Sequence, residues 1–201
     1  GTLTQNRMSI KRLCLYGENP VKDSDEFSQN QIEFLKMLAC ASNALIQIDE
    51  DGSPQYIGDA TETAIIRLFH EKGLDKDQIE EQYPRVAEIP FSSERKMMTV
   101  IIEDPKGGYL VLTKGALDRL PFNKISLENK NKIQKLHDSF AHDALRVIAL
   151  GIKHIDVLPS EDELESVEKD LDFSGIVGLI DPPRPDDYRS EERFSRNAET
   201  D

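Results

Sequence analysis

Apolar side chains recur at helical spacing in two stretches of the first half of the chain. A helix is predicted from Ser28, with one apolar face formed by Ile32, Leu35, Leu38 and Ala39. A second helix is predicted to open at residues 58–62 (GDATE), where Asp59 caps it and Glu62, three residues on, completes a capping box. Its apolar stripe is Ala64, Ile65, Leu68 and Phe69, and Gly73 ends it.

Several short runs are rich in β-forming residues and are bounded by turn residues, which predicts strands. Residues 45–48 predict a short strand that ends in the turn at residues 49–52. Residues 100–102 and 109–112 flank the turn sequence DPKGG, which indicates a hairpin. Residues 126–142 predict a polar helix, and the last two predicted strands are 147–152 and the buried run 175–180.

The order of these elements is mixed and does not follow a β-α-β alternation. We therefore predict an α+β fold, with a mainly antiparallel twisted sheet flanked by helices. Residues 1–12 are polar and basic and are interpreted as a leader outside the core, and the prolines after Asp181 end regular structure. Residues 187–201 have almost no apolar content, which is typical of a disordered or cloning-derived tail.

Composition restricts the classes of partner. Of the 201 residues, 38% are hydrophobic and 31% charged, the balance of a soluble globular protein, and no run approaches the roughly 18 apolar residues of a membrane helix. The formal net charge of −13 excludes nucleic acid as an expected partner, and any nucleotide site must gather its cations locally. Cys14 and Cys40 lack C-x-x-C spacing and are expected to be reduced thiols of a cytosolic protein.

The common phosphate-binding and metal-binding motifs are absent. The sequence contains neither a G-x-x-x-x-G-K-[ST] loop nor a G-x-G-x-x-G loop after a strand. His137 and His142 are five residues apart, a poor fit to one helical face, so no metal site is predicted. A nucleotide would need another kind of site.

Two segments carry candidate binding residues. In FSSERK, the aromatic Phe91 precedes Arg95 and Lys96, which suits a stacking surface for a flat ring with a cation nearby. Taken alone, however, the segment favours a core phenylalanine with solvated basic neighbours. Lys114 lies at a predicted strand end beside a glycine, where its ammonium could meet a ligand or simply face solvent. Arg146 opens a predicted strand and by itself is an ordinary flanking charge.

The joint order of the motifs resembles the P-type ATPase family. GDATE at 58–62, FSSERK at 91–96, KGA at 114–116, ALRV at 144–147 and DPPR at 181–184 follow one another as in that family, over about residues 1–186. The chain begins GTLTQN, similar to the family sequence D-K-T-G-T-L-T that contains the phosphorylated aspartate. The resemblance implies that this aspartate precedes Gly1, so no catalytic residue is expected in the chain.

The resemblance implies a nucleotide-binding domain of 13–172, with 1–12 a remnant of the phosphorylation-domain connection and 173–186 a strand that returns to it. In that family ATP, accompanied by Mg²⁺, is presented to the aspartate, and ADP is the other nucleotide partner. The implied nucleotide-binding residues are Glu62, Phe91, Lys96, Lys114 and Arg146. Secondary candidates are Asp59, Thr61, Arg95, Ile148, Asp181 and Arg184.

The resemblance also implies what kind of larger protein contains this domain. The parent would be an integral membrane pump whose phosphorylation domain, actuator domain and membrane helices contact this cytoplasmic, monomeric and soluble domain. The GDATE and F-S-x-x-R-K forms resemble the calcium-pump or sodium/potassium-pump branch and differ from the heavy-metal branch. The compact insert resembles a bacterial calcium-type pump, so calcium or another small cation is the expected ion. Leu117 and Asp118 replace the usual Pro-Glu after KGA, and Ser93 stands where some calcium pumps have an arginine, which removes one candidate phosphate contact.

Two other functions remain open. A non-catalytic acidic interaction domain would use the same residues only to cap helices and cover the core. A self-sufficient phosphatase or kinase is disfavoured because the sequence has no D-x-D nucleophile motif and no kinase lysine–aspartate set with a glycine loop.

Overall fold

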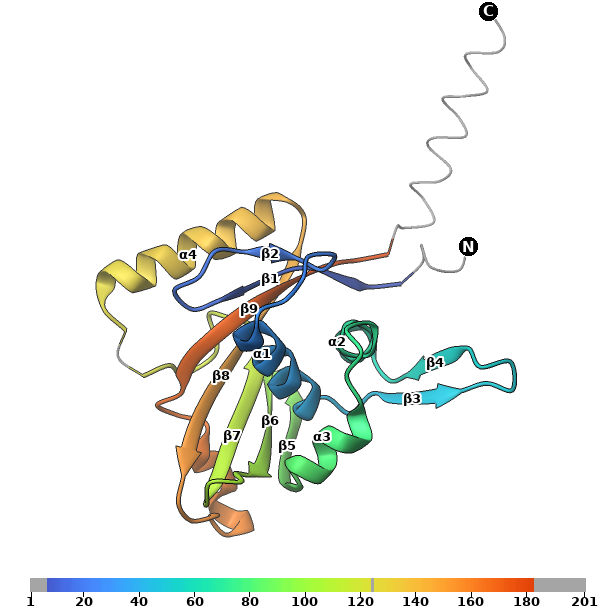
Figure 1. Cartoon of the computed structure of the whole chain (residues 1–201). Helices are drawn as coiled ribbons and strands as arrows, with labels where there is room; N and C mark the ends of the chain where they lie inside the picture. The colour runs from blue at the N-terminus through green and yellow to red at the C-terminus, as the bar shows by residue number, and fades with distance from the viewer. Residues whose placement is uncertain (1–6, 124, 183–201) are drawn as a thin grey trace, which may run out of the picture.

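The computed structural model of the chain describes residues 7–123 and 125–182 and contains one large antiparallel sheet (Figure 1). Its seven strands are ordered β2-β1-β9-β8-β7-β6-β5. Their bounds are Ser9–Leu15 (β1), Val21–Lys22 (β2), Arg85–Ser92 (β5), Met97–Glu103 (β6), Tyr109–Gly115 (β7), Arg146–Ile155 (β8) and Asp172–Ile180 (β9). The predicted α+β class with a mainly antiparallel sheet is confirmed.

Helices and a small hairpin surround this sheet. The helices are α1 (Gln29–Cys40), α2 (Ala60–Glu71), α3 (Lys76–Gln82) and α4 (Leu127–His142), and a 3₁₀ segment, η2, spans Glu161–Val167. Strands β3 (Leu45–Ile48) and β4 (Pro54–Ile57) form a separate two-stranded sheet that projects from the body (Figure 1). Within the described ranges, no helix is long and apolar enough to cross a membrane.

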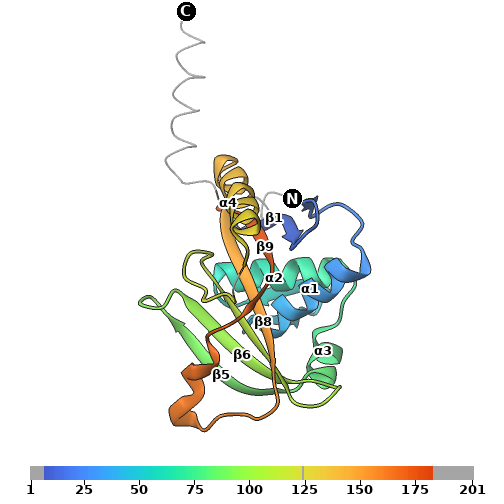
Figure 2. The ribbon, with the colours of Figure 1, turned by 90° about the vertical axis from the view of Figure 1, so that its left-hand side faces the viewer.

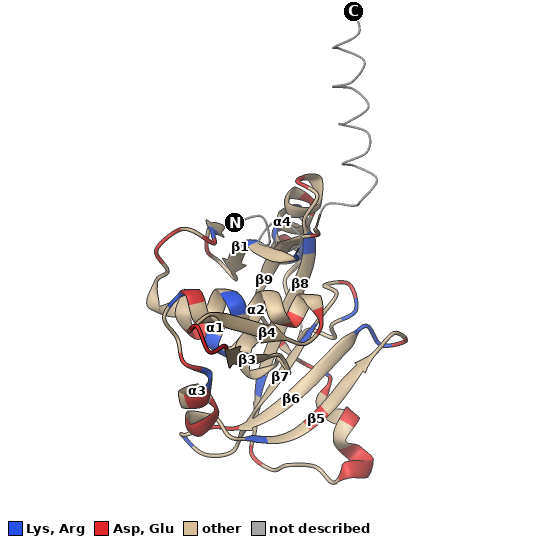
Figure 3. Cartoon of the chain, turned by 90° about the vertical axis from the view of Figure 1, so that its right-hand side faces the viewer, with Lys and Arg blue, Asp and Glu red and all other residues tan. Residues whose placement is uncertain are grey.

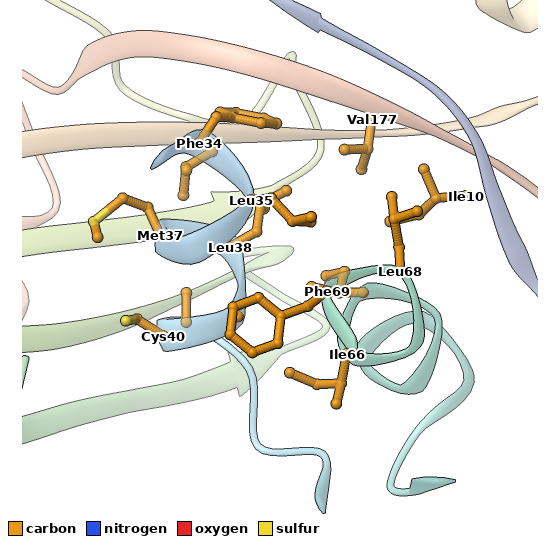
Figure 4. Close-up of a cluster of buried hydrophobic side chains, with 14 of the residues drawn as sticks. Ile10, Phe34, Leu35, Met37, Leu38, Cys40, Ile66, Leu68, Phe69 and Val177 are labelled. Carbon is orange, nitrogen blue, oxygen red and sulfur yellow. The ribbon is translucent and has the colours of Figure 1, made fainter. Parts of the chain in front are cut away.

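Alternating side chains of the central strands bury residues on both faces of the sheet. Leu13 of β1 and Val177 of β9 join the cluster beneath α1 and α2, whereas Cys14 and Ile176 join the cluster beneath α4. Figure 4 shows part of the first cluster, in which apolar side chains of α1 and α2 pack together beside Ile10 of β1 and Val177 of β9. The helices therefore form layers on both faces, as the turned view shows (Figure 2).

Both helices begin where they were predicted, and only the role of the Glu62 side chain differs from the prediction. Ser28 forms a full capping box with Gln31, because its Oγ accepts from the Gln31 backbone N–H at 3.2 Å and Gln31 Oε1 accepts from the Ser28 N–H at 2.8 Å. In α2, Asp59 Oδ1 accepts from the Glu62 N–H at 2.8 Å as predicted. The capping-box role of the Glu62 side chain is wrong, since its carboxylate turns to partners outside the helix.

The interpretation of residues 1–12 as a leader outside the core is wrong from Met8 onward. Met8 and Ile10 are 6% and 3% exposed, and β1 lies between β2 and β9 inside the sheet. The local sequence alternates apolar and basic residues, and only pairing with β9, some 170 residues later, makes it a strand. The assignments of 1–12 and 173–186 as connections to another domain stay predictions, and the tail at 187–201 falls outside the described residues.

Strand β5 was not predicted, although it holds Phe91 at its end. It contains Pro90, which cannot donate to a ladder, and it is tolerated because β5 is an edge strand of the sheet. The predicted hairpin at residues 104–108 is confirmed, with Asp104 N–H donating to Gly108 O at 3.0 Å.

Candidate functional site

Antiparallel pairing brings four strand ends to one place in the sheet. Strands β5 and β7 end where β6 and β8 begin, so Phe91, Met98, Lys114 and Arg146 come from neighbouring strand ends. Met98 and Lys114 are direct cross-strand partners. The N-terminus of α2 lies over these ends and adds Asp59, Thr61 and Glu62.

A cavity of about 410 Å³ lies at this junction. Its wall combines the α2 N-terminus with the strand ends, and the lining residues are Met8, Asp59, Ala60, Thr61, Glu62, Phe91, Met98, Lys114, Gly115, Arg146 and Ile148. The volume falls within the roughly 300–1,000 Å³ of small-ligand sites. A larger hollow of about 670 Å³ lies between α4 and the loop after β1, but its wall contains none of the predicted site residues.

Lys114 and Glu62 form an ion pair in the cavity wall. Lys114 Nζ lies 2.9 Å from Glu62 Oε1 and 2.8 Å from the sulfur of Met98, and the two residues are 6% and 5% exposed. The other carboxylate oxygen of Glu62 accepts from the Asn43 backbone N–H at 2.9 Å. Because each charge has partners, the pair is retained in a largely apolar setting. It also ties α2 to β7 and to the end of α1.

Phe91 is an exposed aromatic residue on the rim. Its side chain is 60% exposed, so the alternative that it is a core phenylalanine is wrong. The sequence contains eight phenylalanines, and Phe34, Phe69 and Phe140 show the burial expected of core residues, at 3%, 1% and 0% exposed. Burial of apolar surface therefore does not explain this aromatic residue, whereas a flat ligand would.

Arg146 supplies a cation at the other side of the cavity. Its Nη2 lies 3.3 Å from Oδ1 of Asp181, and both side chains are more than half exposed. An exposed pair of this kind contributes little, on the order of 0–1 kcal/mol. The guanidinium group can therefore exchange this carboxylate for a more highly charged anion at small cost.

Four predicted residues lie away from the cavity wall or outside the described part. Asp181 is not in the wall and pairs with Arg146 instead. Lys96 is exposed on the turn after β5 and adopts a left-handed backbone with φ of 56°. Arg95 faces Glu168, on the side opposite to Met98 and Lys114, where Thr99 and Thr113 also point. Arg184 falls outside the described residues.

Sequence reasoning missed Met8, Ala60, Met98 and Gly115 as cavity residues. The hairpin register could have found Met98, because counting outward from the turn pairs Glu103 with Tyr109 and hence Met98 with Lys114. Gly115 is a glycine for a steric reason. A Cβ there would lie 2.3 Å from the carbonyl oxygen of Lys96, so the end of β7 could not lie this close to the turn that contains Lys96. No local sequence pattern marked Met8 as a cavity residue.

Comparison with known proteins gives a consistent match. The family described as "P-type ATPase, cytoplasmic domain N" matches residues 30–186. A calcium-transporting ATPase of Bacillus subtilis is 32% identical over 92% of this chain and 24% of its own length, and calcium-transporting ATPase 1 of Lactococcus lactis is 32% identical over 94% and 22%. A sodium/potassium exporting P-type ATPase of Schizosaccharomyces pombe is 28% identical over 92% and 19%. The chain thus spans about a fifth to a quarter of the length of these relatives.

Proposed function

The chain belongs to the cation-transporting P-type ATPases, as their cytoplasmic N domain, and on this premise we propose that its cavity binds the adenine nucleotide of such a pump. The observation that carries the proposal is the joint presence of an exposed aromatic ring, an apolar floor and cations in one cavity. Acidic side chains lie on several elements, α3 among them (Figure 3), and a chain of net charge −13 repels an anion over much of its surface. In the cavity wall, Lys114 and Arg146 balance Asp59 and Glu62, so an anion would be repelled less there.

Each part of the cavity suits one part of the nucleotide. The ring of Phe91 would stack on adenine, and Met98 and Ile148 would cover the apolar floor beneath the base. Glu62 and Lys114 would form the polar wall of the base pocket, held rigid by their own ion pair. Arg146 would contact the phosphates, and the exposed Lys96 could reach them from its turn.

Mg²⁺ would enter with the phosphates of ATP. Across residues 7–123 and 125–182, no group of three or more His, Cys, Asp or Glu side chains could hold a metal ion, so the chain is expected to bind the metal only through the nucleotide. The ion would neutralise phosphate charge there. The residues of the chain would position the nucleotide and form the site for its base.

The family suggests a role for this domain in a whole pump. We propose that the domain presents the γ-phosphate of ATP to an aspartate of the phosphorylation domain, and that the actuator domain and membrane helices complete the cycle. The 201 residues contain no D-K-T-G sequence, so we expect this chain to bind ATP and ADP without hydrolysis. Calcium is the proposed ion because two of the relatives named above are calcium-transporting ATPases.

A nucleotide titration followed residue by residue tests the proposal. Addition of ATP or adenosine should shift the amide resonances of residues 59–62, 91 and 114–116, and label from γ-³²P-ATP should not remain on the protein. Shifts confined to other surfaces, or no shifts at millimolar nucleotide, would favour an acidic interaction domain instead. Hydrolysis that follows the pure protein would contradict the binding-only expectation.

A further inference from the structure

The guanidinium group of Arg95 holds the two residues that flank Phe91. Its Nη1 donates to the carbonyl oxygen of Pro90 at 2.9 Å and to Oγ of Ser92 at 3.3 Å. Pro90 and Ser92 stand immediately before and after the aromatic residue in the chain. A single planar group thus contacts the backbone before the exposed ring, at Pro90, and the side chain after it, at Ser92.

The other edge of the same guanidinium group is held by Glu168. Nε and Nη2 of Arg95 donate to the two carboxylate oxygens at 3.1 and 2.7 Å, the bidentate geometry in which arginine binds carboxylates most strongly. The Glu168 side chain is 7% exposed and also accepts from Oγ1 of Thr99 at 2.5 Å. Thr99 bonds in turn to Thr113 at 2.7 Å, so the carboxylate is anchored on the sheet.

Phe91 has little other support. The regular pairing of β5 with β6 is interrupted between Ile89 and Ser92, and neither Pro90 nor Phe91 has a registered partner there. The ring itself is 60% exposed and gains little from packing. The backbone before the ring, at Pro90, would be freer to move without the Arg95 guanidinium group, whereas Ser92 stays paired with Met97 and its carbonyl oxygen accepts from the Lys96 N–H at 2.7 Å.

We propose that Arg95, locked by Glu168, is the positioning residue of the adenine platform and is not itself a nucleotide ligand. The proposal rests on the proposed function only where it calls Phe91 the platform. Because Glu168 directly follows η2, it also makes the segment 156–171 part of the nucleotide site's support, although that segment lies on the opposite face of the sheet from α2. Pre-ordering of one side chain is worth roughly 0.5–1.5 kcal/mol in binding, or about two- to ten-fold in affinity.

The first test needs no nucleotide. The chain has no tryptophan, so Phe91→Trp introduces a single indole whose nanosecond motion can be followed by time-resolved fluorescence anisotropy. Arg95→Gln and Glu168→Gln should each enlarge the fast component of the decay. Arg85→Gln is the matched control, since Arg85 lies at the other end of β5 and donates to the carbonyl oxygens of Cys40 and Ser42. An indole equally rigid in all four proteins would overturn the proposal.

The second test measures binding in two backgrounds. With Phe91 present, Arg95→Gln should weaken ATP and adenosine equally, by about two- to ten-fold. In the Phe91→Ala background the same change should have no further effect, because the residue acts through the ring. A loss restricted to ATP would make Arg95 a phosphate ligand and refute the positioning role.

The two tests separate the two proposals. A chain that binds no nucleotide, but whose indole loosens on Arg95→Gln, contradicts the proposed function and supports the positioning role. If the chain binds nucleotide and the indole is unaffected by these changes, the proposed function is supported and the positioning role of Arg95 is contradicted. If Arg95→Gln does not fold, Glu168→Gln weakens the bidentate pair that orients the guanidinium group, and Ser92→Ala removes the hydroxyl that this group contacts. Each variant is read by the same two outcomes.

Discussion

Nζ of Lys114 lies 2.9 Å from Oε1 of Glu62, and each side chain is only 7% exposed. The pair joins β7 to the first turn of α2 and forms one wall of the cavity. A lysine whose charge is already balanced by a carboxylate contributes less attraction for a phosphate than a free lysine would. Its main task is therefore to hold the wall in place.

Removal of one member of this pair should destabilise the fold. Lys114→Met leaves the Glu62 carboxylate buried without its counter-ion, and such losses reach about 3–5 kcal/mol. The double change Lys114→Met with Glu62→Gln should recover much of this free energy of unfolding. Urea denaturation of the three proteins measures it, and equal stability of the single variant and the wild type would show that the pair is not needed for folding.

Phe91→Ala should weaken ATP and adenosine alike without a large change in melting temperature. Stacking of a base on an aromatic ring contributes about 1–3 kcal/mol, equivalent to roughly five-fold to over a hundred-fold in affinity. The exposed ring gives the fold little, and Phe91→Trp should retain binding. Phe69→Ala is the contrasting variant, since that buried ring should cost about 3–5 kcal/mol of stability. A large drop in melting temperature for Phe91→Ala would argue against the platform.

Arg146→Ala should weaken ATP more than adenosine. A hydrogen bond to a charged group contributes about 1.5–3 kcal/mol, so a loss of about ten-fold or more for ATP is expected, with little change for adenosine. Arg12→Ala provides a control, since Arg12 also pairs with an exposed aspartate, Asp143, but lies outside the cavity. Equal losses for both ligands would assign Arg146 to the base site or to the fold.

The two buried thiols should make stability fall at alkaline pH. Burial raises the pKa of Cys14 to about 11 and that of Cys40 to about 12. A pKa raised on folding favours the native state below the unfolded value of 9.0, and this contribution is lost as the pH rises through the window from 9.0 to about 11 or 12. At pH 10 the loss is about 1 kcal/mol for each thiol.

A comparison with a thiol-free protein isolates this effect from the tyrosines and lysines that titrate in the same range. The free energy of unfolding of the wild type and of the Cys14→Ala, Cys40→Ala variant should be measured in urea at pH 7.5 and pH 10. The wild type should lose more stability over this interval, so the difference between the two proteins should narrow. A constant difference would mean that the thiols do not carry the pH dependence.

Local patterns predicted the elements whose stability is local. The helices at Ser28 and Asp59 and the hairpin at Asp104–Gly108 are confirmed because caps, apolar stripes and turn residues lie within a few positions of each other. Strands β1 and β5 were missed because their pairing partners, rather than their own composition, make them strands. Long-range pairing leaves no mark in a short window of sequence.

The candidate site was likewise predicted only in part. The resemblance named Glu62, Phe91, Lys114 and Arg146, and the structure brings all four to one cavity. It could not tell that Glu62 and Lys114 bind each other, or that Arg95 turns to Glu168 from 73 positions away. Side-chain partners across the sheet depend on strand order, which the motifs do not encode. The roles of these residues toward a nucleotide stay predictions.

The pairing of β1 with β9 has a mechanical consequence. Ser9 at the start of β1 lies opposite Ile180 at the end of β9, and the two strands run antiparallel from that point. Tension applied to the polypeptide at these two positions would separate the strands like a zipper, with the hydrogen bonds yielding one after another and not sharing the load. Because β1 also carries β2, this force would detach both strands first and leave β9-β8-β7-β6-β5 paired. Met8, which directly precedes β1, would leave the cavity wall with them.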